Sequence, residues 1–466
     1  MQSRRDQVQA QSYVLGRLTS ALVAAEPEAA ENPHRRLLIG TVAGTLIAAL
    51  VVAGFAVYGF LRPGGATSWR KPGTVVVEKE TGSRYVLVDG RLRPVLNYSS
   101  ALLLFGKKPA MTTVSATSLR SVPRGQSVGI VGAPDTLPAP TALAGTTWTV
   151  CAVAGRDAAG TLATATTLTV DRTPSGPVLG PDQGVVAQAP GGETFLVWRG
   201  RRYALTQTWL SRVFGYDGSP APVEPGWLDQ LPVGSDIGPV VVPGRGEPGP
   251  VVDGTQTQIG QLFVARIAGT AERHYLLQRD GLSQLTPTGV AVVSSDPETA
   301  RAYGSRPVVP TELTAAALAG LPASKEPVLP GDLPETPPAV APAGPGRVWC
   351  VRHGDPSGVV RLTAESPLPP GAVAAGDGAG VTRTAGTATA VAFAAGVGGL
   401  VRLGRPGQAP GTTYFVVTDA GIKYPLADPS VAQALGYPTS LAATVSPALL
   451  ELLPTGPLLD PQRARG

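Results

Sequence analysis

The sequence predicts a single-pass membrane protein whose long C-terminal part is mostly-β or α+β, with a central β core domain flanked by four β-hairpin-plus-helix repeat domains in a quasi-two-fold arrangement. Three observations support this prediction. An uncharged apolar run extends from Leu37 to Leu61. Four later segments repeat one pattern, and two others each place a tryptophan near a cysteine. Glycine (58) and proline (47) are abundant while aromatic residues make up only 5% of the chain, which is typical of short strands joined by many turns.

The apolar run is long enough to cross a membrane. It covers 25 positions without a charge, and at about 1.5 Å per residue it exceeds a hydrocarbon core of about 30 Å. A buried core helix of this length would carry a polar face. A cleaved signal peptide has a shorter apolar region. We therefore expect an uncleaved span, in which Gly40 and Gly44, four residues apart, are candidates for close packing against another membrane helix.

The charges that flank the span are nearly balanced, with Arg35 and Arg36 before it and Arg62, Arg70 and Lys71 after it. Long domains cross membranes largely regardless of charge, so the short arginine-bearing tail is the better guide. We expect the N-terminus to be cytoplasmic and the C-terminal part to be extracytoplasmic.

Residues 1–25 predict an amphipathic helix ahead of the span. Val8, Leu15, Leu18 and Leu22 fall on one helical face, and the arginines are expected elsewhere. The helix either lies on the lipid surface, helped by its arginines, or docks a cytoplasmic partner. The residues predicted for docking are Arg4, Arg5, Gln7, Val8, Leu15, Leu18 and Leu22.

Four segments after the span share a hairpin pattern: a strand of aromatic and β-branched residues, a glycine turn and a second strand. The first strands are expected at 84–88, 194–198, 274–278 and 413–418, and the turn glycines are Gly90, Gly200, Gly281 and Gly421. Asp-Gly at 89–90 and 280–281 is typical of tight hairpin turns, because these turns need positive φ.

Three of the repeats then predict a short helix with a capping residue and a glycine stop. These pairs are Asn97 and Gly106, Thr206 or Thr208 and Gly215, and Asp428 (with Pro429 in the first turn) and Gly436. The third repeat has Thr286-Pro287-Thr288-Gly289 at this point, which predicts a shortened element.

A tail containing a valine, a leucine and a Val/Leu-Pro pair follows each helix and is expected to pair back on the hairpin. Its members are Val114, Leu119 and Val122-Pro123-x-Gly125; Val223, Leu228 and Leu231-Pro232-x-Gly234; Val445, Leu449 and Leu453-Pro454-x-Gly456; and, more loosely, Val309-Pro310, Leu318 and Leu321-Pro322. One such unit has little core of its own, so neighbouring units must pack together.

The two cysteines lie in the expected strands 147–153 and 347–352, each followed by a second strand, at 161–171 and 358–364. The order repeat, half-core, repeat, repeat, half-core, repeat is approximately two-fold. Pairing equivalent strands across that axis brings Cys151 beside Cys350. A disulfide closing a loop of about 200 residues would stabilise the fold by roughly 5 kcal/mol and needs an oxidising compartment. Two free buried thiols are the alternative.

These features give the predicted domain boundaries. They are a cytoplasmic tail at 1–36, the membrane helix at 37–61, a linker at 62–72, repeat 1 at 73–125, the first half of the core at 126–185, repeat 2 at 186–248, repeat 3 at 249–327, a Pro-rich linker at 328–346, the second half of the core at 347–400, repeat 4 at 401–458 and a C-terminal tail at 459–466.

The sequence carries no recognised catalytic constellation. The motifs GxxxxGK[ST], GxSxG and HExxH are absent, and two cysteines with three histidines make a zinc site improbable. A Cys350–His353 nucleophile pair is less favoured than a bonded or buried cysteine. The basic residues form no stripe, which argues against nucleic acid. We assign no catalytic, cofactor or metal-binding residue and favour a structural role over an enzyme.

Several of these features together resemble the EccB family, a membrane component of the actinobacterial type VII (ESX) secretion system. The residues that carry the resemblance are Arg4-Arg5-Asp6-Gln7-Val8-Gln9-Ala10, the span at 37–61, Trp69-Arg70, the RYxLVxxG-type repeats and the widely spaced cysteines. The resemblance covers essentially the whole chain. It implies a cytoplasmic tail, one inner-membrane helix and a periplasmic part with a disulfide in its core. It also implies assembly with EccC-like (motor ATPase), EccD-like and EccE-like subunits, with copies of itself and with the bilayer.

Three functions follow from the resemblance. The first is a structural subunit that scaffolds the periplasmic side of the secretion complex and docks partners through the N-terminal helix. The second is ATP hydrolysis, because some family members are described as ATPases; the sequence supplies no nucleotide motif, so ATP is a cofactor only under this alternative. The third is a cell-wall-binding anchor, because the repeats are similar to modules that contact peptidoglycan.

Overall fold

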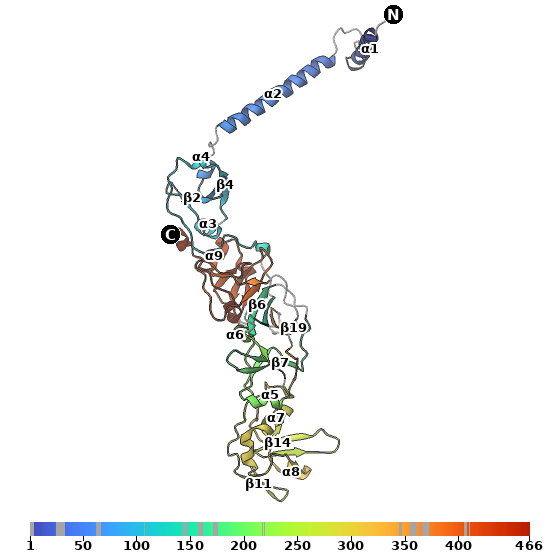
Figure 1. Cartoon of the computed structure of the whole chain (residues 1–466), viewed down its shortest axis with the longest axis vertical. Coiled ribbons are helices and arrows are strands. Elements are labelled where there is room, and N and C mark those ends of the chain that lie inside the picture. The colour runs from blue at the N-terminus through green and yellow to red at the C-terminus, as the bar shows by residue number, and fades with distance from the viewer. Residues whose placement is uncertain are drawn as a thin grey trace. The chain divides into compact units, whose positions relative to one another are not determined.

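The computed structural model describes residues 4–24, 33–61, 67–106, 108–142, 147–156, 162–170, 176–216, 218, 220–343, 347–354, 361–365, 372–404, 408–409 and 411–466. Parts of the predicted linkers and the start of the strand expected at 358–364 lie outside these ranges. The chain divides into two units, Met1–Pro94 with Ala110–Gln126 and Val95–Pro109 with Ser127–Gly466. Figure 1 labels their elements.

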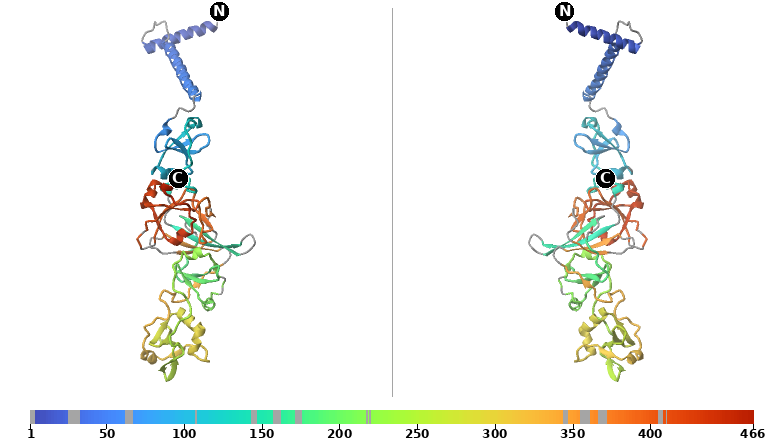
Figure 2. Two further views of the ribbon diagram at one scale, coloured as in Figure 1. Left: turned by 90° about the vertical axis from the view of Figure 1, so that its left-hand side faces the viewer. Right: turned by 90° about the vertical axis from the view of Figure 1, so that its right-hand side faces the viewer.

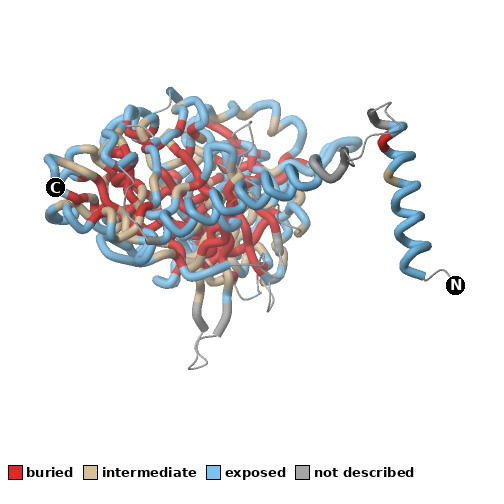
Figure 3. Tube along the Cα trace, turned by 90° about the horizontal axis from the view of Figure 1, so that it is seen from above, coloured by how far each residue is buried: buried red, intermediate tan, exposed pale blue. Residues whose placement is uncertain are grey.

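Two long helices begin the first unit, α1 (Arg4–Ala24) and α2 (Pro33–Leu61). Within α2, Leu37–Phe60 is the one candidate membrane span among the described residues, with 24 residues and none of its window buried in the structure. The trace in Figure 3 is coloured as exposed along almost all of both helices. The described chain does not cover these apolar side chains of α2, which agrees with a helix that lies in lipid.

A four-stranded sheet completes the first unit. It contains β1 (Thr74–Glu78), β2 (Arg84–Val88), β3 (Arg91–Pro94) and β4 (Ala110–Val114), in the order β3-β2-β1-β4. The first three strands form an antiparallel meander, and β4 pairs parallel to β1. Its small core gathers Trp69 of η1 (Ser68–Arg70), Val76, Tyr85, Leu92, Val114 and Leu119 of α4 (Ala116–Leu119).

The same strand order recurs in three sheets of the second unit, β10-β7-β8-β9, β16-β13-β14-β15 and β25-β22-β23-β24. Their strands are β7 (Gln183–Gln188), β8 (Thr194–Trp198), β9 (Arg201–Ala204) and β10 (Ala221–Pro222); β13 (Leu262–Ala265), β14 (Arg273–Gln278), β15 (Gly281–Leu285) and β16 (Thr311–Leu313); and β22 (Gly399–Leu403), β23 (Tyr414–Val417), β24 (Lys423–Pro425) and β25 (Ala443–Val445). Each sheet contains a predicted hairpin and a tail that pairs back. The tail's partner is a preceding strand that the sequence analysis did not include, and two of these strands, β7 and β22, begin before the predicted starts of repeats 2 and 4.

The predicted hairpin glycines all adopt positive φ. Gly90, Gly200 and Gly421 lie at φ values of 72°, 71° and 71°, and Gly281 at 142°. At Gly281 a Cβ would also lie 2.2 Å from the Pro322 carbonyl oxygen. These turns therefore need glycine for conformation and, in the third repeat, for space as well.

Each hairpin is followed by a helix: α3 (Tyr98–Phe105), α5 (Thr208–Val213), α7 (Pro287–Ser295) and α9 (Pro429–Ala434). The prediction of a shortened third element is wrong, because α7 has 9 residues and is the longest of the four. Its N-cap Thr286 accepts a hydrogen bond from the Gly289 N–H, and Pro287 occupies the first turn. The Thr-Pro pair is thus a helix start rather than an interruption.

The end of each tail, Pro-x-Gly in three repeats and Pro-x-Ser in the third, forms a bridge to the second strand of its hairpin, which is β3, β9, β15 or β24. The Leu92, Arg202, Leu282 and Lys423 N–H groups donate to the carbonyls of Pro123, Pro232, Pro322 and Pro454, and the residue two positions after each proline donates back. Glycine is required where this second strand carries tyrosine, since a Cβ at Gly234 or Gly456 would lie 2.3 Å or 2.4 Å from the ring of Tyr203 or Tyr424. In the third repeat the same positions hold Ser324 and Ser283, which explains its missing glycine.

In the third repeat, the tail residue that pairs with the end of β13 is not the predicted one. Leu313 pairs with Ala265 at the end of β13, as Val445 pairs with Leu403 and Val114 with Glu78. Leu313 is buried whereas Val309 is 57% exposed. The first position of this tail was therefore predicted four residues too early, at Val309 instead of Leu313.

The central sheet has six strands in the order β19-β18-β5-β6-β21-β20. They are β19 (Arg361–Glu365), β18 (Val348–His353), β5 (Trp148–Arg156), β6 (Leu162–Val170), β21 (Ala390–Ala392) and β20 (Val373–Ala374). The two expected hairpins, β5–β6 and β18–β19, lie side by side and antiparallel through β5 and β18. The strands β20 and β21 were not predicted.

The repeat helices of the second unit make two similar contacts: α3 packs on α9, and α5 packs on α7. The predicted C-terminal tail is in part a helix, α11 (Pro461–Arg465), which contacts α3 and buries Ala464. Figure 2 shows the second repeat (green) between the central sheet and the third repeat (yellow). The remaining elements are η2 (Pro140–Ala142), α6 (Pro225–Leu228), β11 (Pro248–Val252), β12 (Thr255–Gln258), η3 (Pro297–Ala302), α8 (Ala315–Gly320), β17 (Ala339–Val340), η4 (Thr439–Leu441) and α10 (Pro447–Glu451).

Candidate functional site in the central sheet and the terminal helices

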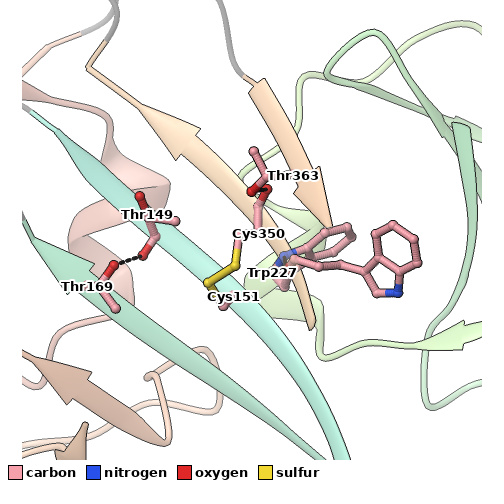
Figure 4. The surroundings of a disulfide bond; sticks show 7 residues. Thr149, Cys151, Thr169, Trp227, Cys350 and Thr363 are labelled. Carbon is pink, nitrogen blue, oxygen red and sulfur yellow. Dashed lines mark hydrogen bonds between the residues drawn. A yellow bond between two sulfur atoms is a disulfide. The ribbon is translucent and has the colours of Figure 1, made fainter. Parts of the chain in front are cut away.

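A disulfide joins the two halves of the central sheet. Cys151 and Cys350 are directly opposite each other in the β5–β18 pairing, with Cα atoms 4.0 Å apart and a sequence separation of 199. Figure 4 shows this bond between the two strands. The strand pairing agrees with the predicted one, and the bond removes the thiol that a Cys350–His353 nucleophile pair would need.

The two faces of the central sheet differ in character. Buried threonines share the disulfide face, among them Thr149, Thr169 and Thr363; the Thr169 hydroxyl donates to the Thr149 carbonyl at 3.4 Å. Trp148 and Trp349 lie at odd offsets from the cysteines along their strands, so their indoles point to the opposite face and join a large apolar cluster. The disulfide therefore ties the sheet together without contributing to the main core.

The tails of the second and fourth repeats meet on the tryptophan face. The indole N–H of Trp227, in α6, donates to the Trp349 carbonyl of β18 at 2.8 Å. Gln230, just after α6, donates to the Ala448 carbonyl of α10 at 3.1 Å. Because Trp227 and Gln230 are both buried, these bonds form in a desolvated environment where an unmade bond is costly.

A half-buried lysine lies at the end of α10. The Lys423 ammonium donates to the Leu450 and Leu453 carbonyls, each at 2.6 Å. Burial lowers the pKa of Lys423 to about 8, while the charge of Glu451 acts in the opposite direction. The ammonium links β24 to two backbone carbonyls at the end of the tail, of which that of Leu450 also accepts from the Leu453 N–H, so its role is structural. The sequence pattern gave no signal for this contact, which depends on how the tail folds back.

His353 ends strand β18 on the side of the sheet opposite to Cys350. Burial lowers its pKa to about 4, so the imidazole is neutral at pH 7. Its Nε2 atom has no hydrogen-bond partner among the described residues.

Cavities among the described residues include one of about 310 Å³ in the second repeat and one of about 740 Å³ in the third. The larger is bounded by Arg273 and His274 but also by Glu272 and Glu335. Over the described residues no group of three or more His, Cys, Asp and Glu side chains is arranged to hold a metal ion. Neither cavity presents a recognised catalytic arrangement.

All seven predicted docking residues lie on α1. Val8, Leu15, Leu18 and Leu22 are 66%, 60%, 54% and 83% exposed, so the apolar face has no cover within the described chain. One expectation is wrong: Arg4 lies one helical turn before Val8 and begins the apolar face rather than lying away from it. Gly40 and Gly44 lie in α2 with open space around both positions, so a neighbouring helix backbone has room to approach.

Two comparisons with curated proteins cover nearly the whole chain. It is 27% identical to "ESX-3 secretion system ATPase EccB3" of Mycolicibacterium smegmatis over 98% of this chain and 89% of the relative. It is 27% identical to "ESX-1 secretion system ATPase EccB1" of Mycobacterium tuberculosis over 98% of this chain and 93% of the relative.

The fold is similar to solved structures. "Structure of EccB3 dimer from the ESX-3 core complex" matches with a TM-score of 0.65 and 25% identity, covering 84% of this chain and 99% of that one. A chain in "Structure of an intact ESX-5 inner membrane complex" matches with a TM-score of 0.64 and 22% identity over 100% of this chain and 95% of that one. The family described as "Type VII secretion system ESX-1, transport TM domain B" matches residues 1–466. The chain, with its one candidate membrane helix and mostly-β body, therefore belongs to this EccB family.

Proposed function

We propose that the chain is a structural subunit of an inner-membrane type VII secretion complex. The observation that carries the proposal is the family match along residues 1–466, which takes in the candidate membrane helix, all four repeated sheets and the disulfide-linked sheet. The N-terminal tail lies in the cytoplasm and the sheets lie on the periplasmic side. The Cys151–Cys350 bond supports this orientation, because disulfides persist in oxidising compartments.

The body acts as a scaffold with a quasi-two-fold plan. The contacts of α3 with α9 and of α5 with α7 support this plan, as does the meeting of the second and fourth tails. The direct opposition of Cys151 and Cys350 supports an axis of the plan at the disulfide. A body cross-linked at its centre in this way offers rigid surfaces to other subunits. One of its apolar clusters joins the central sheet to residues of the second and fourth repeats.

The helix α1 docks a cytoplasmic partner, with EccC-like, EccD-like and EccE-like subunits as the candidates. The exposed apolar face of α1 supports docking, since it needs cover from lipid or protein. Deleting residues 1–26 should leave the chain in the membrane but separate it from its partners. Co-purification of the whole complex with the truncated chain would contradict docking.

A substitution series separates docking from lipid binding. Leu15, Leu18 and Leu22 replaced together by serine should abolish partner co-purification while α2 keeps the chain membrane-bound. The same number of serines on the opposite face, at Gln9, Ala10 and Ala21, is the matched control and should preserve it. Equal retention of partners by both triple variants would favour a helix that only lies on lipid.

ATP hydrolysis is a second candidate, favoured by the names of the relatives, which include the word ATPase. The larger cavity gives it little support, because Glu272 and Glu335 would repel a polyphosphate beside Arg273. ATP turnover by the purified chain that falls on substitution of Arg273 would support this function. Turnover that no substitution in either cavity changes would indicate a contaminating enzyme.

A further inference from the structure

The outer edge of β4 is an unprotected sheet edge. In the order β3-β2-β1-β4, the β3 edge is bridged by the tail through Leu92 and Arg124. Within the part of the chain that the structure describes, β4 pairs with β1 and with no other strand. One row of backbone donors and acceptors therefore remains available along β4.

The equivalent edges in the other repeats are protected. Strand β10 has 2 residues and includes Pro222. Strand β16 has 3 residues and includes Glu312. Strand β25 also has only 3 residues. By contrast, β4 has 5 residues, Ala-Met-Thr-Thr-Val, with no charge and no proline. Short length, charge and proline are the usual protections of an edge, and β4 lacks all three.

The hydrogen bonds of β4 show which residues face outward. The Ala110 N–H donates to the Gly73 carbonyl at 3.1 Å, and the Val114 carbonyl accepts from the Lys79 N–H at 2.8 Å. These two residues therefore face β1, and by alternation Thr112 does so too. The N–H and C=O groups of Met111 and Thr113 point away from the sheet. The Met111 side chain is itself 53% exposed.

We infer that β4 is an interface between two copies of this chain, which pair antiparallel about Thr112. In this register Met111 of one copy and Thr113 of the other exchange hydrogen bonds in both directions, and all 5 residues of the strand overlap. The uncharged sequence brings no like charges together across the pair. The register joins two four-stranded sheets into one.

A second copy is the occupant that the observations favour. A relative with 25% identity over 84% of this chain has been solved as an EccB3 dimer. The candidate span Leu37–Phe60 would hold two copies in the same membrane, which raises their local concentration. The inference rests on the proposed function, in which copies of the chain assemble, and it names the surface through which they do so.

A cysteine at Thr112 tests the register. Directly opposed residues in a non-hydrogen-bonded pair have Cα atoms about 4.5 Å apart, which suits a disulfide. Cys151 and Cys350 oppose each other in this way at 4.0 Å, and their bond leaves the new thiol unpaired within its own chain. The full chain in membranes with its partners, mildly oxidised, should give a covalent dimer with Thr112→Cys. Met111→Cys should give at least fivefold less, because Met111 faces Thr113. Equal yields, or no dimer with Thr112→Cys, would overturn the inference.

Proline substitutions test the hydrogen bonds. Met111→Pro removes an outward N–H and leaves the bonds to β1 intact, so self-association of the full chain in detergent should weaken at least tenfold. Thr444→Pro is the matched control: the Val445 carbonyl accepts from Gly404, so Thr444 faces outward on β25. No change with Met111→Pro, in a chain that still forms multimers with its partners, would overturn the β4 interface alone. A wild-type chain that is monomeric and without partners would contradict the proposed function as well.

Discussion

The indole N–H of Trp227 donates to the main-chain carbonyl of Trp349 at 2.8 Å, with both tryptophans buried. This bond links the tail of the second repeat to a strand of the central sheet that lies 122 residues away in sequence. It fixes the position of α6 beneath the sheet, at the place where α10 of the fourth repeat also packs.

Removing the Trp227 bond should destabilise the chain by about 1–2 kcal/mol. Trp227→Phe keeps most of the apolar volume but loses the N–H donor, so the buried carbonyl loses a partner. Thermal unfolding of the full chain in detergent, followed by circular dichroism, measures the effect. Trp198→Phe is the control, because Trp198 donates to the Pro181 carbonyl at 2.8 Å in an exposed setting and should cost less. Equal losses would contradict a special role for the buried bond.

Breaking the disulfide should cost several kcal/mol. The bond joins cysteines with a sequence separation of 199, and for a loop of this length chain entropy gives roughly 5 kcal/mol. Cys151→Ala combined with Cys350→Ala should lower the unfolding temperature, and reductant should then have no further effect on the variant. An unchanged unfolding temperature would show that the central sheet does not depend on this cross-link.

The tail glycines that face tyrosines should tolerate no side chain. Gly456→Ala places a Cβ 2.4 Å from the Tyr424 ring, a contact that the buried ring cannot relieve without moving. We expect a loss of about 1–3 kcal/mol. Gly125→Ala is the matched control, because its nearest neighbour at 3.0 Å is the flexible Arg93 side chain. Similar unfolding temperatures for the two variants would contradict the steric account of the Pro-x-Gly motif.

Acid should destabilise the central sheet through His353. Its pKa is about 4 in the folded chain, below the ordinary 6.5, so the unfolded state binds more protons between these values. The resulting stability is complete above pH 6.5 and is lost as the pH falls to about 4, with a maximum of roughly 3 kcal/mol. His353→Gln should flatten this part of the stability curve. A wild-type curve that stays parallel to that of the variant would disprove the contribution.

The sequence was sufficient for the local features. Hairpins with Asp-Gly turns and helices with Asn97 or Asp428 caps depend on residues close in the chain, and the structure has them. The strand that precedes each predicted hairpin was missed, because a strand such as β13 is buried along its whole length and shows no alternation. Its parallel partner β16 is distant in sequence and gives no local signal either. The third helix was predicted to be shortened on the basis of Thr286-Pro287-Thr288-Gly289, although Pro287, Thr288 and Gly289 are its first three residues.

The contacts that build the candidate site were less predictable. The cysteine pairing followed from the order of the repeats, which is visible in the sequence. The contact of Lys423 with the end of α10 and that of Gln230 with Ala448 depend on tertiary packing between tails, which no local pattern encodes. The tryptophan in the second tail was a usable signal, since a large aromatic residue in a short helix is usually buried.

The most direct test of the structural role is native mass spectrometry of the complex extracted in detergent from membranes, with every co-purifying protein identified. The account predicts more than one copy of this chain together with other type VII membrane subunits, and loss of the cytoplasmic partners when residues 1–26 are deleted. A full-length chain that is extracted alone as a monomer would contradict it.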